Sequence, residues 1–342
     1  MRRYANLIET GLSDRTGFSI HRVSLASEAT REWLPAKAQT LAHHAGIYRR
    51  SGQLARRREF DIYHVVDGSH GYLLKPLTQQ ATVVTVHDII PKLQSEGRFA
   101  GQGLGRASRL VVDQALSGIR YASRVIVDSE STGRDLRDHG MTCDLPVIYP
   151  PLEPGFAGPT SLTTQRDPFP FVLHIGNNGF YKNRKGVLEI FAKMAADVPH
   201  HLKMAGPPPT REHLEFIEQT RLTDRVHWVH HPTDAEVKEL YRTASLLLFP
   251  SIYEGFGWPP IEAMASGCPV VCSDSGSLAE VVGDAAMVSR HVDIGQMAND
   301  AMVLLRDASR REKLIGAGYQ NVKRFDLASF GDQLIDVYET LR

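Results

Sequence analysis

The sequence predicts an α/β protein made of two doubly wound, Rossmann-like domains that face each other across a cleft. The length of 342 residues suits two domains of ordinary size. Short apolar runs typical of buried parallel strands alternate with helical segments along most of the chain. A proline-rich, polar run at residues 151–170 has the composition of an interdomain linker. We therefore expect domains at residues 1–150 and 171–325 and a separate last helix at 326–342.

Composition excludes several classes of protein. Lysine plus arginine and aspartate plus glutamate are equal at 39 each, so no overall field recruits nucleic acid. The three cysteines (Cys143, Cys268 and Cys272) do not have the spacing of a disulfide framework. Cys268 and Cys272 flank an expected buried strand, which predicts small reduced core residues. The sequence has no apolar stretch near ~18 residues and no signal peptide. We expect a soluble cytoplasmic protein.

The first half begins with a helix over Arg2–Leu12, where apolar residues recur at helical spacing. The alternating run Phe18–Leu25 predicts a strand. A polar helical region follows. The further elements expected in this half are strands at Phe60–Val66, Ala81–Val86 and Ser123–Val127, a helix at Ala107–Ala122, and a helix that Ser129 caps.

A basic cluster lies in the polar helical region and comprises Arg49, Arg50, Arg56, Arg57 and Arg58. With Trp33 and Tyr48 nearby, it could dock on an anionic lipid surface, where each basic residue contributes ~1 kcal/mol. The alternative is a solvated helical face.

His87 follows the strand Ala81–Val86, and in a doubly wound sheet this position points into the ligand crevice. The alternative is a structural histidine. Asp88 either contacts a ligand or caps the following turn. Three glycines in Gly101–Arg106 resemble a dinucleotide loop but follow no strand, so the context for that motif is missing.

The second half starts with the strand Phe171–Ile175, which runs into Gly176 and Asn177. Lys182, Arg184 and Lys185 come next, directly before an expected helix at Val187–Ala196. A glycine turn with cations at a helix start can cradle a diphosphate. The alternative is a solvated basic turn. The other elements expected here are strands at Leu202–Ala205, Val226–Val229, Ala244–Phe249 and Val270–Cys272, helices at Thr210–Gln219 and Asp234–Thr243, and a helical end at Ile294–Arg342 with a break at Phe325.

The most informative stretch runs from Pro250 to Ala286. Its loop contains Glu254, Gly255, Phe256 and Gly257, and a helix beginning near Pro259 contains Glu262. Glycine lets the backbone approach a ligand, and a helix start favours an anion. Carboxylates accept hydrogen bonds from vicinal hydroxyls, so the pair fits a ligand with sugar rings and phosphates. The alternative is a loop acid and a glutamate that merely favours the first helical turn.

Two features argue against a metal. The chain has no Asp-x-Asp motif to hold a metal-bound diphosphate. His227, His230 and His231 lie near one strand, but no acidic partner accompanies them. We expect no metal site.

The string EGFG, then PxxEAMAxGxPVV, then Glu280 before VVGDAA resembles the donor-site motif of the family 4 retaining glycosyltransferases, which have the GT-B architecture. VTVHDIIP, around His87, and the YKN step at Tyr181–Asn183 are similar to further motifs of that family. The resemblance implies that Lys182 binds the diphosphate, Glu254 the donor-sugar hydroxyls, Glu262 the ribose and His87 the sugar. It also implies metal-independent transfer from a nucleotide-diphosphate sugar, with no other cofactor, to a glycan or lipid-linked acceptor.

The chain departs from the family pattern in two places. Relatives usually open with a strand and a glycine-rich loop, so either the start is truncated or misassigned or the first sheet has lost an element. Relatives often carry an arginine where Asn177 stands, and Arg184 or Lys185 would have to replace it. The alternatives to a transferase are a non-catalytic nucleotide-sugar-binding or scaffold protein and a GT-B-fold sugar-nucleotide epimerase.

Overall fold

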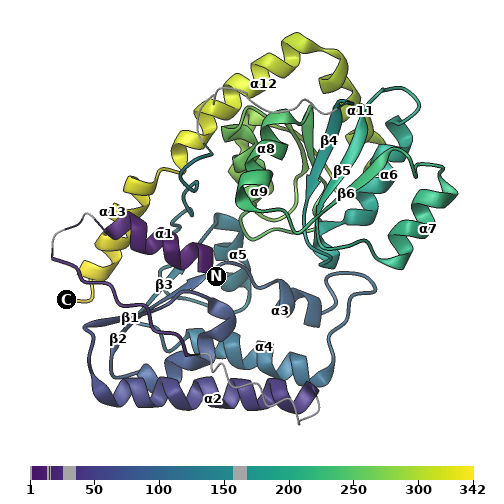
Figure 1. Cartoon of the computed structure of the whole chain (residues 1–342). Coiled ribbons are helices and arrows are strands. Elements are labelled where there is room, and N and C mark those ends of the chain that lie inside the picture. The colour runs from purple at the N-terminus through teal and green to yellow at the C-terminus, as the bar shows by residue number, and fades with distance from the viewer. Residues whose placement is uncertain (1, 14, 16, 26–35, 157–167) are drawn as a thin grey trace. The chain divides into compact units, whose positions relative to one another are not determined.

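The structure is a computed structural model that describes residues 2–13, 15, 17–25, 36–156 and 168–342 (Figure 1). The chain divides into two compact units. Unit 1 comprises Met1–Pro151 with Leu327–Arg342, and unit 2 comprises Leu152–Asp326. The predicted linker at 151–170 lies partly outside the described residues. Each unit contains a parallel sheet with helices on both faces, the arrangement expected of two Rossmann-like domains.

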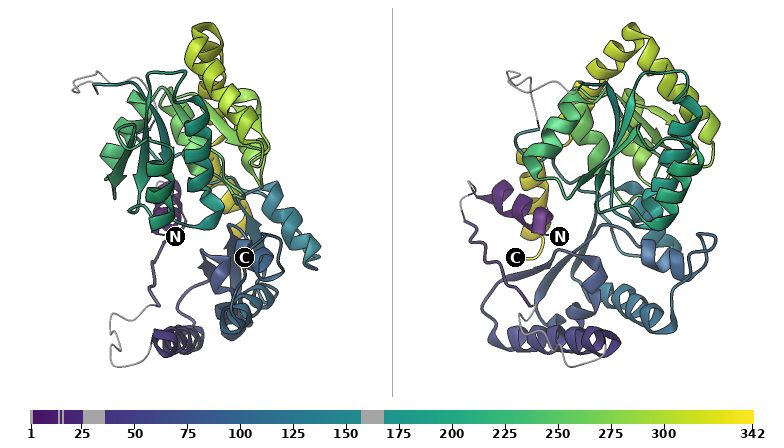
Figure 2. Two further views of the ribbon diagram at one scale, coloured as in Figure 1. Left: turned by 90° about the vertical axis from the view of Figure 1, so that its right-hand side faces the viewer. Right: turned by 45° about the vertical axis from the view of Figure 1, so that its right-hand side comes forward.

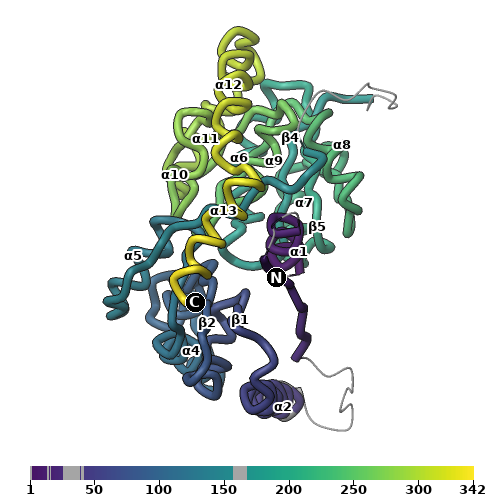
Figure 3. The backbone as a smooth tube through the Cα atoms, turned by 90° about the vertical axis from the view of Figure 1, so that its left-hand side faces the viewer, coloured from purple at the N-terminus to yellow at the C-terminus, as the bar shows by residue number. Residues whose placement is uncertain are grey.

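The sheet of unit 1 has the order β1-β2-β3, with all described strands parallel. Its strands are β1 (Ile62–Val65), β2 (Ala81–Val86) and β3 (Arg124–Val127). Helices α2 and α4 lie on one side of it and α1 and α13 on the other (Figures 1 and 3). These and the other helices of unit 1 are α1 (Arg2–Leu12), α2 (Ala36–Arg57), η1 (Gly68–Leu77), α3 (Ile90–Ser95), α4 (Arg106–Ile119), α5 (Glu130–Asp138) and α13 (Leu327–Glu339).

The first and last helices of unit 1 pack against each other. A Cβ placed on Gly331 would lie 2.3 Å from the carbonyl oxygen of Gly11, so only glycine allows α1 and α13 this close approach. The last helix, α13, therefore packs directly against the first helix, α1, within unit 1 (Figure 3).

The strand predicted at Phe18–Leu25 is wrong. These residues have no regular secondary structure, and the side chains of Ile20 and Val23 are 41% and 45% exposed. Side-chain contacts hold the segment instead: Arg22 pairs with Glu9, and the guanidinium of Arg342 lies 4.6 Å from the centre of the Phe18 ring. Alternating apolar residues give a potential strand one apolar side, but they do not specify a neighbouring strand. A strand forms only where its backbone groups can pair with those of a neighbour.

Unit 2 has a six-stranded parallel sheet in the order β6-β5-β4-β7-β8-β9. Its strands are β4 (Phe171–Ile175), β5 (His201–Gly206), β6 (Val226–His230), β7 (Leu246–Phe249), β8 (Val270–Ser273) and β9 (Met287–Ser289). From β4 the chain proceeds outward to β5 and β6, and it returns to the other side of β4 for β7 to β9. The carboxyl ends of β4 and β7 therefore form a topological switch point, where doubly wound sheets bind ligands.

Helices cover both faces of this sheet (Figure 2). Val172 packs into the core beneath α6 and α11, and the next residue, Leu173, packs into the core beneath α8 and α9. The helices of unit 2 are η2 (Phe180–Lys182), α6 (Arg184–Met194), α7 (Arg211–Gln219), α8 (Asp234–Thr243), α9 (Trp258–Ala265), α10 (Leu278–Val282), η3 (Gly283–Ala285), α11 (Ile294–Arg306), α12 (Ala308–Asn321) and η4 (Val322–Arg324).

The described part of the chain contains no helix with the length and apolar content that a membrane span requires.

Candidate functional site

The loops that follow β4 and β7 are joined at the switch point of unit 2. The amide of Ile252 donates to the carbonyl of Tyr181 over 2.7 Å, and Asn183 Nδ2 donates to the carbonyl of Pro250 over 2.9 Å. Asn183 has a φ of 51°, and its side chain also caps α6 by accepting from the amide of Gly186. Asparagine tolerates this left-handed conformation better than most residues. One side chain thus fixes both loops and the start of α6.

Lys182 and Glu254 form a buried ion pair between these loops. Lys182 Nζ lies 2.7 Å from Oε1 and 3.0 Å from Oε2 of Glu254, and the two side chains are 14% and 8% exposed. The ammonium group also lies 5.2 Å from the centre of the Phe249 ring. Two predicted donor-binding residues, 72 positions apart in the sequence, are therefore in direct contact.

Arg184 is buried at the first position of α6, with 3% of the residue exposed. Its Nη1 donates to Asn178 Oδ1 and to the carbonyl of Pro207, and its guanidinium lies 4.7 Å from the centre of the Trp228 ring. No carboxylate pairs with it among the described residues, and its Nε and Nη2 meet no acceptor there. Burial lowers the pKa of Arg184 to about 10, which still leaves it charged at neutral pH.

Lys185 differs from Arg184. Its side chain is 49% exposed, and its Nζ pairs with Glu212 at 2.6 Å. Of the two residues that the sequence offered in place of the missing arginine, only Arg184 is a buried cation without a counter-charge.

The glycine turn after β4 is tightly packed. A Cβ on Gly206, which has a φ of 139°, would lie 2.2 Å from the carbonyl oxygen of Gly176. Asn177 accepts a hydrogen bond from the amide of Gly179 over 2.8 Å and so shapes the turn. The turn brings the backbone of two strand ends together beside the cations.

The loop of Glu254, Gly255, Phe256 and Gly257 is held from behind by Ser277. The Oγ of Ser277 donates to the carbonyls of Phe256 and Glu254 over 2.7 Å and 3.2 Å. Ser277 occupies the N-cap position of α10, but its side chain does not bond to the helix amides. Gly257 has a φ of 100° at the N-cap of α9, a conformation that glycine adopts without strain.

Glu262 lies on the buried face of α9 and is 4% exposed. Its Oε2 accepts a hydrogen bond from the hydroxyl of Tyr241 over 2.9 Å. No sequence pattern singles out Tyr241, because it lies on a different helix, 21 positions earlier.

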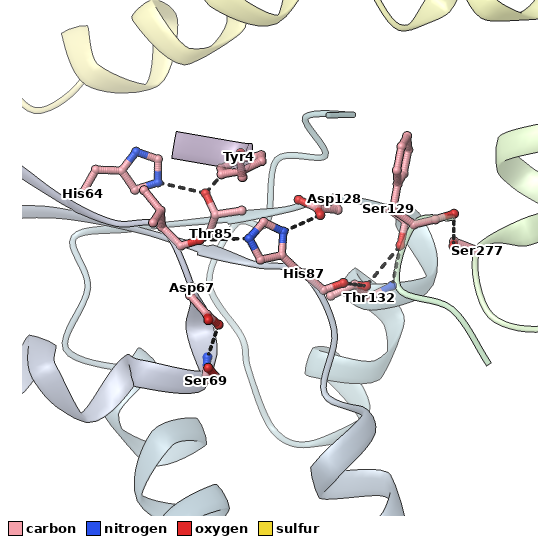
Figure 4. A network of polar contacts seen from close by, with 12 residues as sticks. Tyr4, His64, Asp67, Ser69, Thr85, His87, Asp128, Ser129, Thr132 and Ser277 are labelled. Atoms are coloured by element: carbon pink, nitrogen blue, oxygen red, sulfur yellow. Dashed lines mark hydrogen bonds and ion pairs between the residues drawn. The ribbon is translucent and has the colours of Figure 1, made fainter. Parts of the chain in front are cut away.

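In unit 1, His87 lies at the carboxyl end of β2, as predicted, and its ring is held on both sides (Figure 4). Its Nδ1 lies 2.5 Å from Asp128 Oδ2, and its Nε2 lies 2.9 Å from the carbonyl oxygen of Val66. A carboxylate and a carbonyl can only accept, so when Asp128 is ionised both ring nitrogens donate and His87 is an imidazolium. Burial would lower the pKa of His87, but the Asp128 carboxylate and these hydrogen bonds raise it to about 9.

Neighbouring side chains complete this network (Figure 4). The Tyr4 ring meets the His87 ring edge-on, with centroids 4.7 Å apart. Thr85 Oγ1 contacts the hydroxyl of Tyr4 and the Nε2 of His64. Asp88 Oδ1 accepts from the amide of Ile90, which is the capping role considered for it.

Asp128 directly follows β3, and Asp67 lies two residues after the end of β1; neither was among the predicted site residues. The common edge of parallel strands therefore places both near His87, which directly follows β2. The position of each aspartate after a strand was the signal that could have found them.

The described residues include no group of three or more histidines, cysteines or acidic residues suited to a metal ion. His227 instead stacks on His201, with ring centroids 5.0 Å apart.

The basic cluster is mostly exposed. Arg49, Arg56, Arg57 and Arg58 face solvent, whereas Arg50 donates to the carbonyl of Leu25. Trp33 lies outside the described residues.

Two family models match the chain. The model described as Glycosyltransferase Family 4 matches residues 18–156, and the model described as Glycosyl transferases group 1 matches residues 163–321. The switch-point loops of unit 2 fall within the second match.

Curated relatives include mannosyltransferases. The O-antigen chain mannosyltransferase B of Escherichia coli is 31% identical over 50% of this chain and 46% of its own length. The MMP alpha-(1->4)-mannosyltransferase of Mycolicibacterium hassiacum is 35% identical over 36% of this chain and 31% of its own length. The match therefore spans less than half the length of either relative.

Solved structures share the fold at low sequence identity. Sucrose-phosphate synthase of Thermosynechococcus elongatus has a TM-score of 0.80 at 20% identity, covering 99% of this chain and 92% of that one. WaaG, a glycosyltransferase involved in lipopolysaccharide biosynthesis, has a TM-score of 0.73 at 16% identity, covering 98% and 95%. Anabaena HepE, solved with UDP and glucose, has a TM-score of 0.71 at 18% identity, covering 86% and 81%.

The Lys182–Glu254 pair predicts strong coupling. Lys182→Met leaves the buried Glu254 carboxylate unpaired, and Glu254→Gln leaves the buried Lys182 ammonium without a counter-charge. We therefore expect each variant to reduce the free energy of unfolding by about 3–5 kcal/mol. The double variant should lose clearly less unfolding free energy than the sum of the two single losses. The exposed pair Lys185–Glu212 is the matched control, with a coupling below about 1 kcal/mol in urea unfolding. Additive losses at the buried pair would contradict its assignment as one interaction.

The His87–Asp128 pair predicts a pH dependence. The pKa of His87 is about 9 in the folded chain and about 6.5 in the unfolded chain. The pair therefore stabilises the fold fully below pH 6.5, and its contribution, about 3 kcal/mol, disappears as pH rises through 9. We expect denaturant unfolding between pH 6 and 9.5 to show this loss in the wild type. Asp128→Asn should reduce this dependence of the unfolding free energy on pH. The same pH dependence in both proteins would exclude the ion pair.

Proposed function

Because this chain belongs to the group 1, family 4 glycosyltransferases of GT-B architecture, we propose that it transfers a hexose from a nucleotide-diphosphate sugar to a glycan or lipid-linked glycan. The sugar is a mannose or a glucose, and the transfer retains the anomeric configuration without a metal. The names of the curated mannosyltransferases and the UDP and glucose bound to HepE support the hexose and the donor class.

The buried Arg184 is the observation that carries this proposal. A buried cation without a counter-charge costs free energy unless an anion accompanies it. Arg184 begins α6, whose first amides and dipole also favour an anion, and Lys182 lies on the same loop. A diphosphate supplies the missing charge. As the leaving group of the transfer it gains negative charge, which Lys182 and Arg184 stabilise.

The carboxylates of the second loop suit the remainder of the donor. In this proposal Glu254, released from Lys182 when the phosphates arrive, accepts hydrogen bonds from the sugar hydroxyls, and Glu262 accepts them from the ribose. Gly176, Asn177, Gly255, Phe256 and Gly257 shape the backbone around the donor. Lys185 is exposed and paired, so we assign it no direct contact.

One observation favours the alternative of a protein that binds nucleotide sugars without turnover. The role that the resemblance implies for His87 needs a ring nitrogen for the sugar, and both nitrogens are already bonded within unit 1. A catalytic His87 must exchange its bond to Val66 for one to the substrate. His87→Ala should then reduce transfer while leaving nucleotide affinity unchanged.

We predict nucleotide-selective stabilisation in a thermal-shift series with UDP, GDP, ADP and their sugar conjugates. Arg184→Met removes a buried charge but keeps contact with Trp228, so the ligand-free protein should remain stable while affinity falls about 10- to 100-fold. Lys182→Ala should act similarly on affinity, and Lys185→Ala is the matched control with little effect. A stable protein that responds to no nucleotide would overturn the proposed function. Product release that persists with a chelator would support metal independence.

We further propose that the protein works in the cytoplasm and contacts the inner face of the membrane through α2. Its exposed arginines would each contribute ~1 kcal/mol on an anionic surface. We expect co-sedimentation with phosphatidylglycerol vesicles but not with phosphatidylcholine vesicles. Replacing Arg49, Arg56 and Arg57 by Gln should abolish it, whereas Lys at the same positions should preserve it. Equal binding of both triple variants would exclude this electrostatic contact.

A further inference from the structure

Tyr241 lies in the last turn of α8 with its side chain completely buried. Its ring packs in the core beneath α8 and α9 and meets the ring of Phe156 edge-on, with centroids 6.1 Å apart. A tyrosine has only two main side-chain torsions, so this packing also fixes where its hydroxyl lies. The hydroxyl donates to Glu262 Oε2 over 2.9 Å.

Glu262 gains an orientation from this bond. A glutamate has three side-chain torsions, and a buried carboxylate is stabilised by each donor that it faces. Tyr241 holds one of its two oxygens at a fixed point in unit 2. A carboxylate can accept about four hydrogen bonds, so the bond from Tyr241 leaves further accepting capacity for a ligand.

We propose that Tyr241 is a positioning residue that orients Glu262 toward the 2′- and 3′-hydroxyls of the donor ribose, so that the site selects ribonucleotides over deoxyribonucleotides. The inference rests on the proposed function, in which Glu262 binds the ribose. A fixed carboxylate can meet both hydroxyls of a vicinal diol at once. A mobile carboxylate must lose torsional freedom on binding, so it gains less binding free energy from the second hydroxyl.

This role is separable from a merely structural one. Loss of core packing would weaken the binding of every nucleotide alike, because the phosphates and base would be affected together. Loss of carboxylate orientation weakens only ligands that carry the ribose hydroxyls. The ratio of the affinities for a ribonucleotide and for its deoxy analogue, measured on one folded variant, therefore depends on the orientation of the Glu262 carboxylate. A general loss of stability affects both affinities and cancels in the ratio.

The experiment measures dissociation constants of the whole chain by calorimetry. The ligands are UDP or GDP, whichever stabilises the protein, and its 2′-deoxy and 3′-deoxy analogues. We expect the wild type to prefer the ribonucleotide about 10- to 100-fold. Tyr241→Phe should reduce that preference to a few-fold, with little change for the deoxy analogues. In a Glu262→Ala background the same substitution should change nothing further.

Tyr63→Phe is the matched control. Tyr63 is also a buried tyrosine, 7% exposed, and its hydroxyl meets no hydrogen-bond partner among the described residues. It should keep the full ribose preference. If the wild type binds and discriminates but Tyr241→Phe retains the whole preference, the positioning role is wrong and the proposed function stands. If the folded wild type binds no nucleotide, both fail.

Discussion

The reversal of chain order between β4 and β7 is the constraint on which the candidate site depends. Because these neighbouring strands are parallel, both end at the same edge of the sheet, and the connections that follow them diverge in opposite directions. The two loops therefore meet there without a helix between them. This topology brings Lys182 and Glu254 into contact across 72 positions of sequence and lets Asn183 fix both loops.

The charges at this edge are unequally matched. The carboxylate of Glu254 balances Lys182, but the described residues hold no acid that balances Arg184. Burying such a cation does not stabilise the fold, since an apolar side chain of similar size would fill the same space beside Trp228 with a lower free energy. The buried charge is explained if an anion binds beside it. The same logic explains why Lys185, whose charge is solvated and paired, gives no comparable signal.

Local signals in the sequence predicted most elements of the fold. Ser129 caps α5 by accepting from the amide of Thr132, as predicted, because a cap involves residues three positions apart. Phe18–Leu25 was wrongly predicted as a strand, since a strand needs a partner that alternation does not specify. The same limit applies to the site. Lys182 and Glu254 carry recognisable motifs, whereas Asp128 and Tyr241 matter only through residues 41 and 21 positions away.

The two units hold their buried ionic groups in different ways. In unit 1, His87 pairs with Asp128 Oδ2, and the carbonyl of Val66 accepts a hydrogen bond from the other ring nitrogen. Such a pair is a rigid, nearly neutral element, and a ligand gains from it only by displacing a bond that already exists. In unit 2, the Nε and Nη2 of Arg184 meet no acceptor among the described residues, so an anion that reaches Arg184 adds bonds there without breaking any, whereas Glu254 must first release Lys182. Binding free energy should therefore come mainly from unit 2, and any contribution of His87 should appear in the rate of the reaction and not in affinity.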